Sequence, residues 1–106
     1  MITAEEARNI TKAAQEAKRK IAEDFIITEI NGALDKVIKE AAEKGTNKAR
    51  FQCTSEDLDA NGVDSHYLAE ELQKYFDALG FEYEISPDYK LNGTYSPNAI
   101  SFWVVW

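Results

Sequence analysis

The chain has 106 residues, of which 44% are hydrophobic and 29% are charged, a composition typical of a globular domain. A formal net charge of −7 argues against direct nucleic-acid binding, and a single cysteine excludes an intramolecular disulfide and a cysteine-based zinc cage. No apolar run approaches the ~18 residues of a membrane helix, and the polar, acidic start is unlike a secretory signal. We therefore expect a cytoplasmic protein with no membrane partner.

The charge is unevenly distributed along the chain. Residues 1–50 carry a net charge of +1, whereas residues 51–106 carry −8. A negative surface can attract a basic groove on a partner or a cation, or it can simply be well solvated. Each of these interpretations stays open at this stage.

The N-terminal segment has the pattern of a capped amphipathic helix. Thr3 and Glu6 have the spacing of a capping box. A narrow, alanine-rich apolar stripe follows at steps of three and four residues: Ala7, Ile10, Ala14, Ala17 and Ile21. Small side chains bury little area, so this helix either lies close against a partner helix or packs thinly.

A second apolar stripe is out of phase with the first. It consists of Ile27, Ile30, Leu34, Val37, Ile38, Ala41 and Ala42. Either the helix bends near residues 23–28, or one long helix rotates its buried face. We favour the bend, because an unbroken helix over 3–44 would span about 60 Å, too long for a compact domain. Gly45 is the expected end of the second helix.

The middle of the chain predicts a strand, a loop and a helix. Residues 49–54 alternate, with Ala49, Phe51 and Cys53 on one face. An acidic loop follows over 55–62. Leu68, Leu72, Phe76 and Leu79 then mark an amphipathic helix over 64–79, which Gly80 ends.

The last 26 residues predict a β-hairpin. Asn92-Gly93 favours a type I′ turn, and folding about it pairs three sets of apolar residues on one face: Ile85 with Ile100, Tyr83 with Phe102, and Phe81 with Val104. Pro87 and Pro97 should loosen the pairing toward the turn, so that the tip from Tyr89 to Tyr95 projects as an arm.

These elements define the expected fold class. It is α+β, with two N-terminal helices followed by β-α-β-β and a three-stranded, mainly antiparallel sheet packed by helices. We expect one domain over 1–106, with a helical part (1–45) and a β-α-β-β part (49–106). The Phe51 strand should pair at one edge of the hairpin.

The face of the hairpin opposite the core carries the candidate interaction residues. Glu82 and Glu84 lie there beside Ser101, Trp103 and Val105, and Trp106 ends the strand. Bulky apolar groups on this second face need cover. The N-terminal helix, a second copy of the chain or a foreign partner would each supply it.

One loop has part of a calcium-binding pattern. Asp57, Asp59 and Asn61 supply oxygen ligands at alternate positions before Gly62. The bidentate glutamate that closes such a site is missing, because Leu68 occupies its position. We therefore expect no bound metal, and a connector in which Asp64 or Ser65 caps the next helix.

No constellation for catalysis is evident. His66 lies beside Asp64 and Ser65, but neighbours in one helical turn cannot converge as a triad. Cys53 lies on an apolar strand face and is expected to be a small core residue. We expect Lys18, Arg19 and Lys20 to form a solvated helix face. The chain is predicted to be no enzyme and to use no cofactor.

Several segments together resemble a loose group of small, mostly uncharacterised phage and prophage proteins. They are Glu6-Ala7-Arg8 with Thr11, the helix end Ala41-Ala42-Glu43-Lys44-Gly45, the helix end Leu79-Gly80-Phe81, and the strand Ile100-Ser101-Phe102-Trp103. The resemblance covers nearly the whole chain and implies its fold and a phage origin. It implies no catalytic residue. The terminal Val104-Val105-Trp106 goes beyond the usual end of these proteins.

Two functional hypotheses follow. The first is a non-enzymatic phage accessory protein in the host cytoplasm that binds a host protein, for example to inhibit a defence factor or a nucleic-acid-binding factor through its acidic half. The second is a homo-oligomer that sequesters a small ligand such as a nucleotide signal, with Tyr89 and Tyr95 stacking on a base and Lys90 supplying charge. Self-association is expected in either case.

Overall fold

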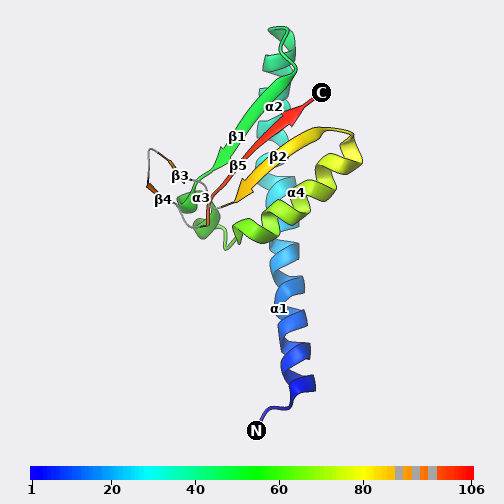
Figure 1. The fold of residues 1–106 in the computed structure, drawn as a ribbon, viewed down its shortest axis with the longest axis vertical. Coiled ribbons are helices and arrows are strands. Elements are labelled where there is room, and N and C mark those ends of the chain that lie inside the picture. Colours follow the sequence, from blue (N-terminus) through cyan, green and yellow to red (C-terminus); the bar gives the residue numbers. More distant parts are fainter. Residues whose placement is uncertain (88–89, 92–93, 96–97) are drawn as a thin grey trace.

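The structure is a long helical rod with a small antiparallel sheet and two further helices packed along its C-terminal part (Figure 1). This computed structural model describes residues 1–87, 90–91, 94–95 and 98–106. In chain order the elements are α1 (Ala4–Phe25), the π-helical segment η1 (Ile26–Ile30), α2 (Asn31–Glu43), β1 (Lys48–Cys53), α3 (Ser55–Ala60), α4 (Ser65–Leu79), β2 (Glu82–Pro87), β3 (Lys90–Leu91), β4 (Thr94–Tyr95) and β5 (Ile100–Val105). The predicted α+β class is confirmed.

The N-terminal helix begins where the sequence predicts. The Thr3 hydroxyl accepts a hydrogen bond of 3.1 Å from the backbone N–H of Glu6, which caps the first turn. Helical structure then continues through α1, η1 and α2 with no intervening residue. The junction between the two expected helices is therefore a π-helical segment within continuous helical structure rather than a break.

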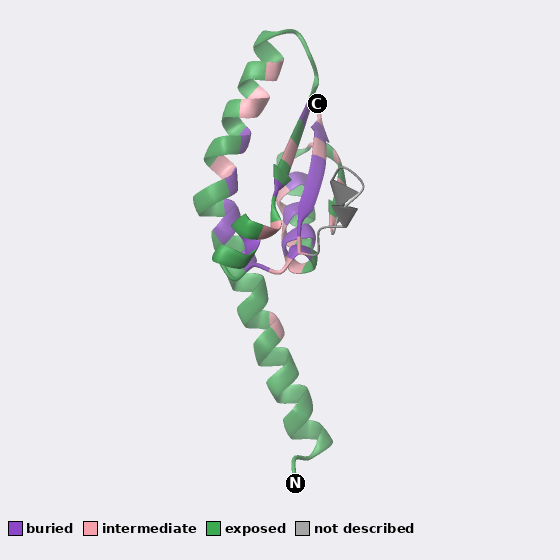
Figure 2. Ribbon diagram, turned by 90° about the vertical axis from the view of Figure 1, so that its left-hand side faces the viewer, coloured by how far each residue is buried: buried purple, intermediate pink, exposed green. Residues whose placement is uncertain are grey.

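The π-helical segment explains the change of phase between the two apolar stripes. A π-turn adds a residue to the helix, so it rotates every later side chain around the axis. The Asn31 N–H bonds to the Ile26 carbonyl five residues back, and the Thr28 hydroxyl donates to the Asp24 carbonyl at 2.9 Å. In Figure 2 the helix axis also changes direction at this level, so the position expected for a bend was right.

The buried line of the helix differs by one residue from the predicted stripe. Ala22, Ile26, Ile30 and Leu34 are all buried, at a spacing of four residues. That spacing lies between the 3.6 residues of an α-turn and the wider π-turn, so η1 keeps these residues on one side. Ile27, predicted to be in the stripe, is 62% exposed.

The overall shape is elongated. The radius of gyration is 16.0 Å and the principal extents are 61 × 33 × 20 Å, whereas a compact domain of this size has a radius of about 13 Å. Figure 2 shows why: the first half of α1 extends away from all other elements as an exposed helix. Compactness, the premise behind the expected bend, does not hold for this part of the chain.

A left-handed glycine connects α2 to the sheet. Gly45 has φ +84° and its N–H bonds to the Ala42 carbonyl, while Thr46 bonds back to the Ala41 carbonyl through both its N–H and its hydroxyl. The predicted stop at Gly45 is confirmed. β1 then follows within one residue of the predicted strand, with Ala49 and Cys53 buried.

The acidic segment after β1 is a helix rather than the expected loop. Thr54 caps α3 by accepting from the N–H of Asp57 at 3.3 Å. Leu58 is fully buried beneath the helix, so burial of one leucine anchors this short element. α4 starts at Ser65 with Asp64 as its cap and ends at Gly80, as predicted, although Leu79 is 55% exposed.

The sheet has the order β1-β5-β2, so the C-terminal strand is central. Both pairings are antiparallel. The predicted antiparallel pairing of these two strands is confirmed, but the predicted residue pairs are wrong by two positions. Ile85 lies opposite Phe102 rather than Ile100, and Tyr83 lies opposite Val104 rather than Phe102. Phe81, expected opposite Val104, lies just before β2.

The shift arises between the turn and the main strands. β3 and β4 pair Lys90 with Tyr95 and Leu91 with Thr94, the register expected for a turn centred on 92–93. Two residues separate β2 from β3, whereas four separate β4 from β5, so the main strands pair two positions further along. An even shift leaves every side chain on its predicted face. The turn expected at residues 92–93 and the arm tip expected at Tyr89 lie outside the described residues.

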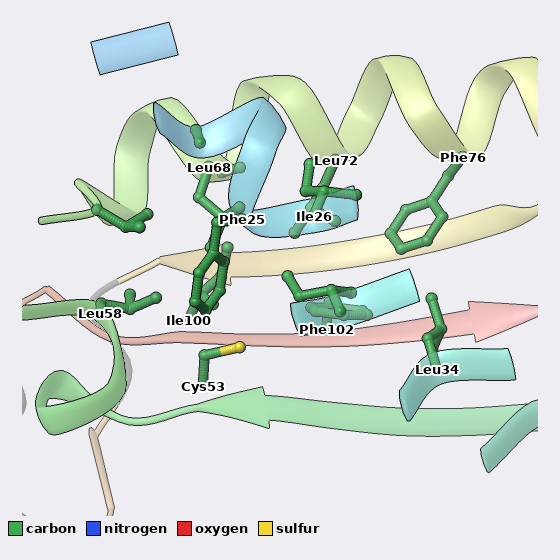
Figure 3. Packing of buried hydrophobic residues seen from close by; sticks show 14 of the residues in the cluster. Phe25, Ile26, Leu34, Cys53, Leu58, Leu68, Leu72, Phe76, Ile100 and Phe102 are labelled. Atoms are coloured by element: carbon green, nitrogen blue, oxygen red, sulfur yellow. The ribbon is translucent and has the colours of Figure 1, made fainter. Parts of the chain in front are cut away.

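The core lies between the sheet and the helices. Figure 3 shows Leu68, Leu72 and Phe76 of α4 pointing toward the sheet, with Phe25 and Ile26 beside them. The Phe76 ring lies 5.4 Å from the Phe102 ring, centroid to centroid. Both the N-terminal helix and α4 therefore cover the same face of the sheet, which leaves the opposite face without them.

Candidate interaction face

Alternation along the three strands places a polar set of side chains around one tryptophan on the side of the sheet opposite the core. We call this the outer sheet face; it consists of Lys48, Arg50 and Gln52 on β1, Ser101, Trp103 and Val105 on β5, and Glu82, Glu84 and Ser86 on β2. The β1 and β2 members are all exposed, and Trp103 and Val105 are partly buried. The predicted grouping of Glu82, Glu84, Trp103 and Val105 on one face is present.

The N-terminal helix does not cover this face, contrary to the first of the three expected covers. Its buried residues Phe25, Ile26, Ile30 and Leu34 belong to the same core cluster as Phe102. Because Phe102 and Trp103 are neighbours in a strand, they point to opposite sides of the sheet. The helix therefore packs on the side away from Trp103.

Two cations of the neighbouring strand pack on Trp103 instead. The Lys48 ammonium lies 3.9 Å from the centroid of the Trp103 ring, and the Arg50 guanidinium carbon lies at 5.3 Å. Each such contact contributes about 0.5–1 kcal/mol at an exposed site, and the aliphatic stems add apolar cover. The two side chains therefore cover part of the indole.

The two edges of the outer sheet face have opposite charge. Arg50 and Glu84 both lie opposite Trp103, on β1 and β2 respectively, and Lys48 and Glu82 both lie opposite Val105. The result is a row of cations, a central aromatic and aliphatic strand, and a row of carboxylates. The acidic character expected of this half of the chain is thus balanced on the outer sheet face.

Sequence reasoning missed Lys48 and Arg50 as members of the face. The alternation of Ala49, Phe51 and Cys53 already indicated that residues 48 and 50 point outward. What it did not indicate was the neighbour of β1, since either edge of the hairpin was open to it. The pairing of Arg50 with Trp103 follows only from the observed strand order.

Trp106 lies at the end of the central strand, beside but not within this set. Its ring is 6.4 Å from the Phe81 ring in an edge-to-face arrangement, and its backbone N–H donates to the Asn47 backbone carbonyl at 3.1 Å. It remains 40% exposed. Alternation along the strand places Trp106 on the same side of the sheet as Val104, and Phe81 packs against the core cluster. The predicted grouping of Trp106 with Trp103 and Val105 on the outer sheet face is therefore wrong.

Asn98 is a third residue that sequence reasoning missed. It has φ +54° and joins three segments: its carbonyl oxygen accepts from the Ser65 N–H at 2.7 Å, and its amide nitrogen donates to an Asp59 carboxylate oxygen at 2.7 Å and to the Val63 carbonyl at 2.8 Å. Asparagine tolerates left-handed backbone, which was the available signal. The residue fixes α3 and the start of α4 against the start of β5.

The candidate cation loop is not formed. Asp57 and Asp59 lie on α3, where residues two apart point to different sides of the helix. Asp59 accepts from Asn98, and the Asn61 side chain donates to the Asp57 backbone carbonyl at 2.8 Å. Within the described ranges, no group of three histidine, cysteine, aspartate or glutamate residues is placed to hold a metal ion.

Cys53 is the buried core residue that the strand pattern predicts. It is 4% exposed, and burial together with the nearby Asp57 carboxylate raises the pKa of its thiol to about 12. It lines a groove of about 180 Å³ with Phe25, Glu29 and Phe51. A thiol that stays protonated is a poor nucleophile, so this groove has no activated cysteine.

The other candidate residues do not converge on a common site. His66 lies in the first turn of α4, and its backbone N–H donates to Asp64 at 2.9 Å. Lys18 and Arg19 lie over the Tyr67 ring, at 5.6 and 6.0 Å from its centroid. Of the alternative ligand-binding residues, Tyr89 and the side chains of Lys90 and Tyr95 lie outside the described part of the chain.

Comparisons with protein-family models, with curated proteins and with solved structures find no match to this chain. None of the helices in the described residues combines the length and apolarity of a membrane span. The outer sheet face is thus the feature from which a function is best argued.

Proposed function

We propose that this protein is a non-enzymatic binding protein that contacts a protein partner through its outer sheet face. One observation carries the proposal: Trp103, which is partly buried, stands between two exposed charged edges and contacts Lys48 and Arg50. Tryptophan and arginine are the residues most enriched among those that dominate binding energy in protein interfaces.

The geometry of the face supports this use. Contacts that restrict the indole would lower the entropy lost when it enters a partner's pocket. The surrounding rows of cations and carboxylates form the polar rim that surrounds an apolar centre in many interfaces. The partner we infer has an apolar pocket flanked by acidic groups on one side and basic groups on the other.

This proposal keeps the first hypothesis from the sequence and narrows it. The binding surface is a face with both charges rather than a uniformly acidic half. Binding to a host protein, and the phage origin that the resemblance implies, stay predictions. Because the rim is charged, we expect binding to weaken as ionic strength rises.

Site-specific photocrosslinking in the cells that naturally express the protein tests the proposal. A photoreactive residue replaces Gln52 or Ser86, which lie at the two edges of the outer sheet face, or Lys39, which is exposed on α2. We expect the same crosslinked protein from positions 52 and 86, absent at position 39, and lost when Trp103→Ser is added.

Two results would contradict the proposal. One is an equal crosslink from position 39, which would place the contact elsewhere. The other is a crosslink at positions 52 and 86 that survives Trp103→Ser. Thermal unfolding of Trp103→Ser serves as the control, and a midpoint close to that of the wild type shows that the loss of crosslinking reports the surface rather than the fold.

A further inference from the structure

The first five turns of α1 expose an apolar stripe that the rest of the chain does not cover. Of residues 1–21, none is buried, and the first buried residue is Ala22. Ile10 is 61% exposed and Ile21 is 40% exposed. Figure 2 shows the first half of α1 standing apart from the other elements. An isolated helix of this length is marginally stable in water, so a covering partner would stabilise it.

The stripe has the spacing of a helix–helix seam. Ala7, Ile10, Ala14, Ala17 and Ile21 follow at alternating steps of three and four, the repeat that keeps one face in contact with a second helix. Two positions flank such a seam, one on each side. Glu6, Ala13 and Lys20 line one flank, and Ala4, Thr11 and Lys18 line the other.

We propose that a second copy of this chain covers the stripe, with the two α1 helices antiparallel. In this arrangement Ile10 lies against Ala14 of the partner subunit and Ala7 lies against Ala17 of the partner subunit. The alanines let the two helices approach closely, which suits the small side chains along the stripe. This inference does not depend on the proposed function.

Charge complementarity selects the antiparallel direction. In an antiparallel pair, the flank with Glu6 and Lys20 on one helix faces the same flank of the partner helix. Glu6 therefore faces Lys20 of the partner subunit, and the twofold symmetry repeats this ion pair. In a parallel pair, opposite flanks meet: Glu6 would face Thr11 of the partner subunit, and Lys20 would face Phe25 of the partner subunit. The antiparallel register therefore gains two ion pairs that the parallel register lacks.

The ends of the stripe fit the same register. It brings the N-terminus of one chain beside Ile21 of the other, where Ile21, Asp24, Phe25, Thr28 and Asn61 line a groove of about 180 Å³. Met1 and Ile2, both exposed in the single chain, are the apolar residues at that end of the partner helix. The two globular parts lie at opposite ends of the seam.

The seam is short compared with stable protein interfaces, which bury about 1,200–2,000 Å². We therefore expect a dimer with a dissociation constant of roughly micromolar magnitude. It would carry one outer sheet face at each end. Such a dimer presents its binding surface twice, which raises the avidity for a partner that is itself multivalent.

Sedimentation equilibrium with charge-swapped full-length chains tests the proposal. Glu6→Lys places two lysines opposite the native lysines in its own homodimer, and Lys20→Glu places two glutamates opposite the native glutamates. We expect each variant alone to dissociate at least tenfold more readily than the wild type. An equimolar mixture should regain affinity through the heterodimer, because the lysine introduced at position 6 of one variant then faces the glutamate introduced at position 20 of the other.

Matched controls come from the opposite side of the same helix. Glu5→Lys and Lys12→Glu make the same charge changes away from the seam, and we expect them to leave the dissociation constant unchanged. Ile10→Lys should abolish the dimer while the thermal unfolding midpoint at low concentration stays the same. A wild-type chain that remains monomeric at several hundred micromolar overturns the proposal, as does a mixture that fails to recover, or a control that weakens as much as Glu6→Lys.

Discussion

The N-terminal helix contains two stretches with the same kind of apolar pattern and different environments. Up to Ile21 the pattern faces solvent, whereas from Ala22 to Leu34 it faces the core of the domain. The boundary falls within one turn, just before the π-helical segment. Apolar periodicity thus predicts that a helix face is a contact surface, but it does not tell whether the contact lies within the chain.

The test with the largest expected change in unfolding free energy compares two adjacent isoleucines in η1. Ile26 is 3% exposed and Ile27 is 62% exposed. Ile26→Ala leaves a cavity in the core and should lower the free energy of unfolding by about 2–5 kcal/mol. Ile27→Ala should change it by less than about 0.5 kcal/mol. Urea unfolding of both variants measures the two values. Equal losses of unfolding free energy would show that Ile27 is buried as well, and that the helix does not face the core through Ile26 alone.

A second test concerns Asn98, which fixes α3 and the start of α4. These elements lie against the packed stretch of the N-terminal helix, which we define as residues 22–34. Asn98→Gly keeps the left-handed backbone accessible but removes the hydrogen bonds to Ser65, Val63 and Asp59. We expect a loss of about 2 kcal/mol in the free energy of unfolding.

Asn98→Ala separates the two contributions. It removes the same hydrogen bonds and places an alanine, which disfavours left-handed backbone, at φ +54°; this costs about 1 kcal/mol more than glycine. Chemical denaturation of the two variants side by side gives the difference. A glycine variant as stable as the wild type would show that these hydrogen bonds do not contribute to stability.

The sequence predicted the fold where local chemistry acts alone. Thr3, Gly45, Asp64 and Gly80 each end or begin a helix by a mechanism that needs only their own backbone or side chain, and alternation assigned the strand residues to the correct face. Two features depend on distant parts of the chain and were not predictable. One is the two-residue shift of the hairpin register. The other is the strand order, which brings Arg50 and Lys48 to Trp103.

The candidate site shows the same division. The sequence placed Trp103, Glu82 and Glu84 on one face, because the side-chain period of a strand is two. It did not supply the cation–aromatic contacts, since those require knowing that β1 lies beside β5 and not beside β2. Of the three covers left open by the sequence, the N-terminal helix is excluded, because its buried residues pack with Phe102 on the other side of the sheet.

A third test uses the thiol beneath the packed stretch of the helix. In the folded chain the pKa of Cys53 is raised from 9.0 to about 12, so the unfolded chain releases the thiol proton first. The stability due to the protonated thiol is complete below pH 9 and is lost between pH 9 and about 12. The slope is at most about 1.4 kcal/mol per pH unit.

Comparison with Cys53→Ala isolates this effect, because the pKa values of Tyr75 and Tyr83 are also raised, by burial and by the hydrogen bond to Asp77 respectively. Urea unfolding between about pH 8 and 11 should show a shallower decline for the variant than for the wild type. Parallel curves would mean that the helix does not close over the thiol in solution.

The smallest expected effect belongs to the exposed stretch of the helix. Removal of residues 1–15 leaves Lys18 and Arg19 on the Tyr67 ring and touches no buried residue. At low concentration the free energy of unfolding should therefore change by less than about 0.5 kcal/mol. At high concentration the two chains should diverge, because a dimer stabilises only the folded state. The full chain should then unfold at a midpoint that rises with concentration, and the shortened chain at a constant one. Two midpoints that rise together would locate self-association outside this helix, whereas a large loss at low concentration would show that the exposed stretch supports the domain after all.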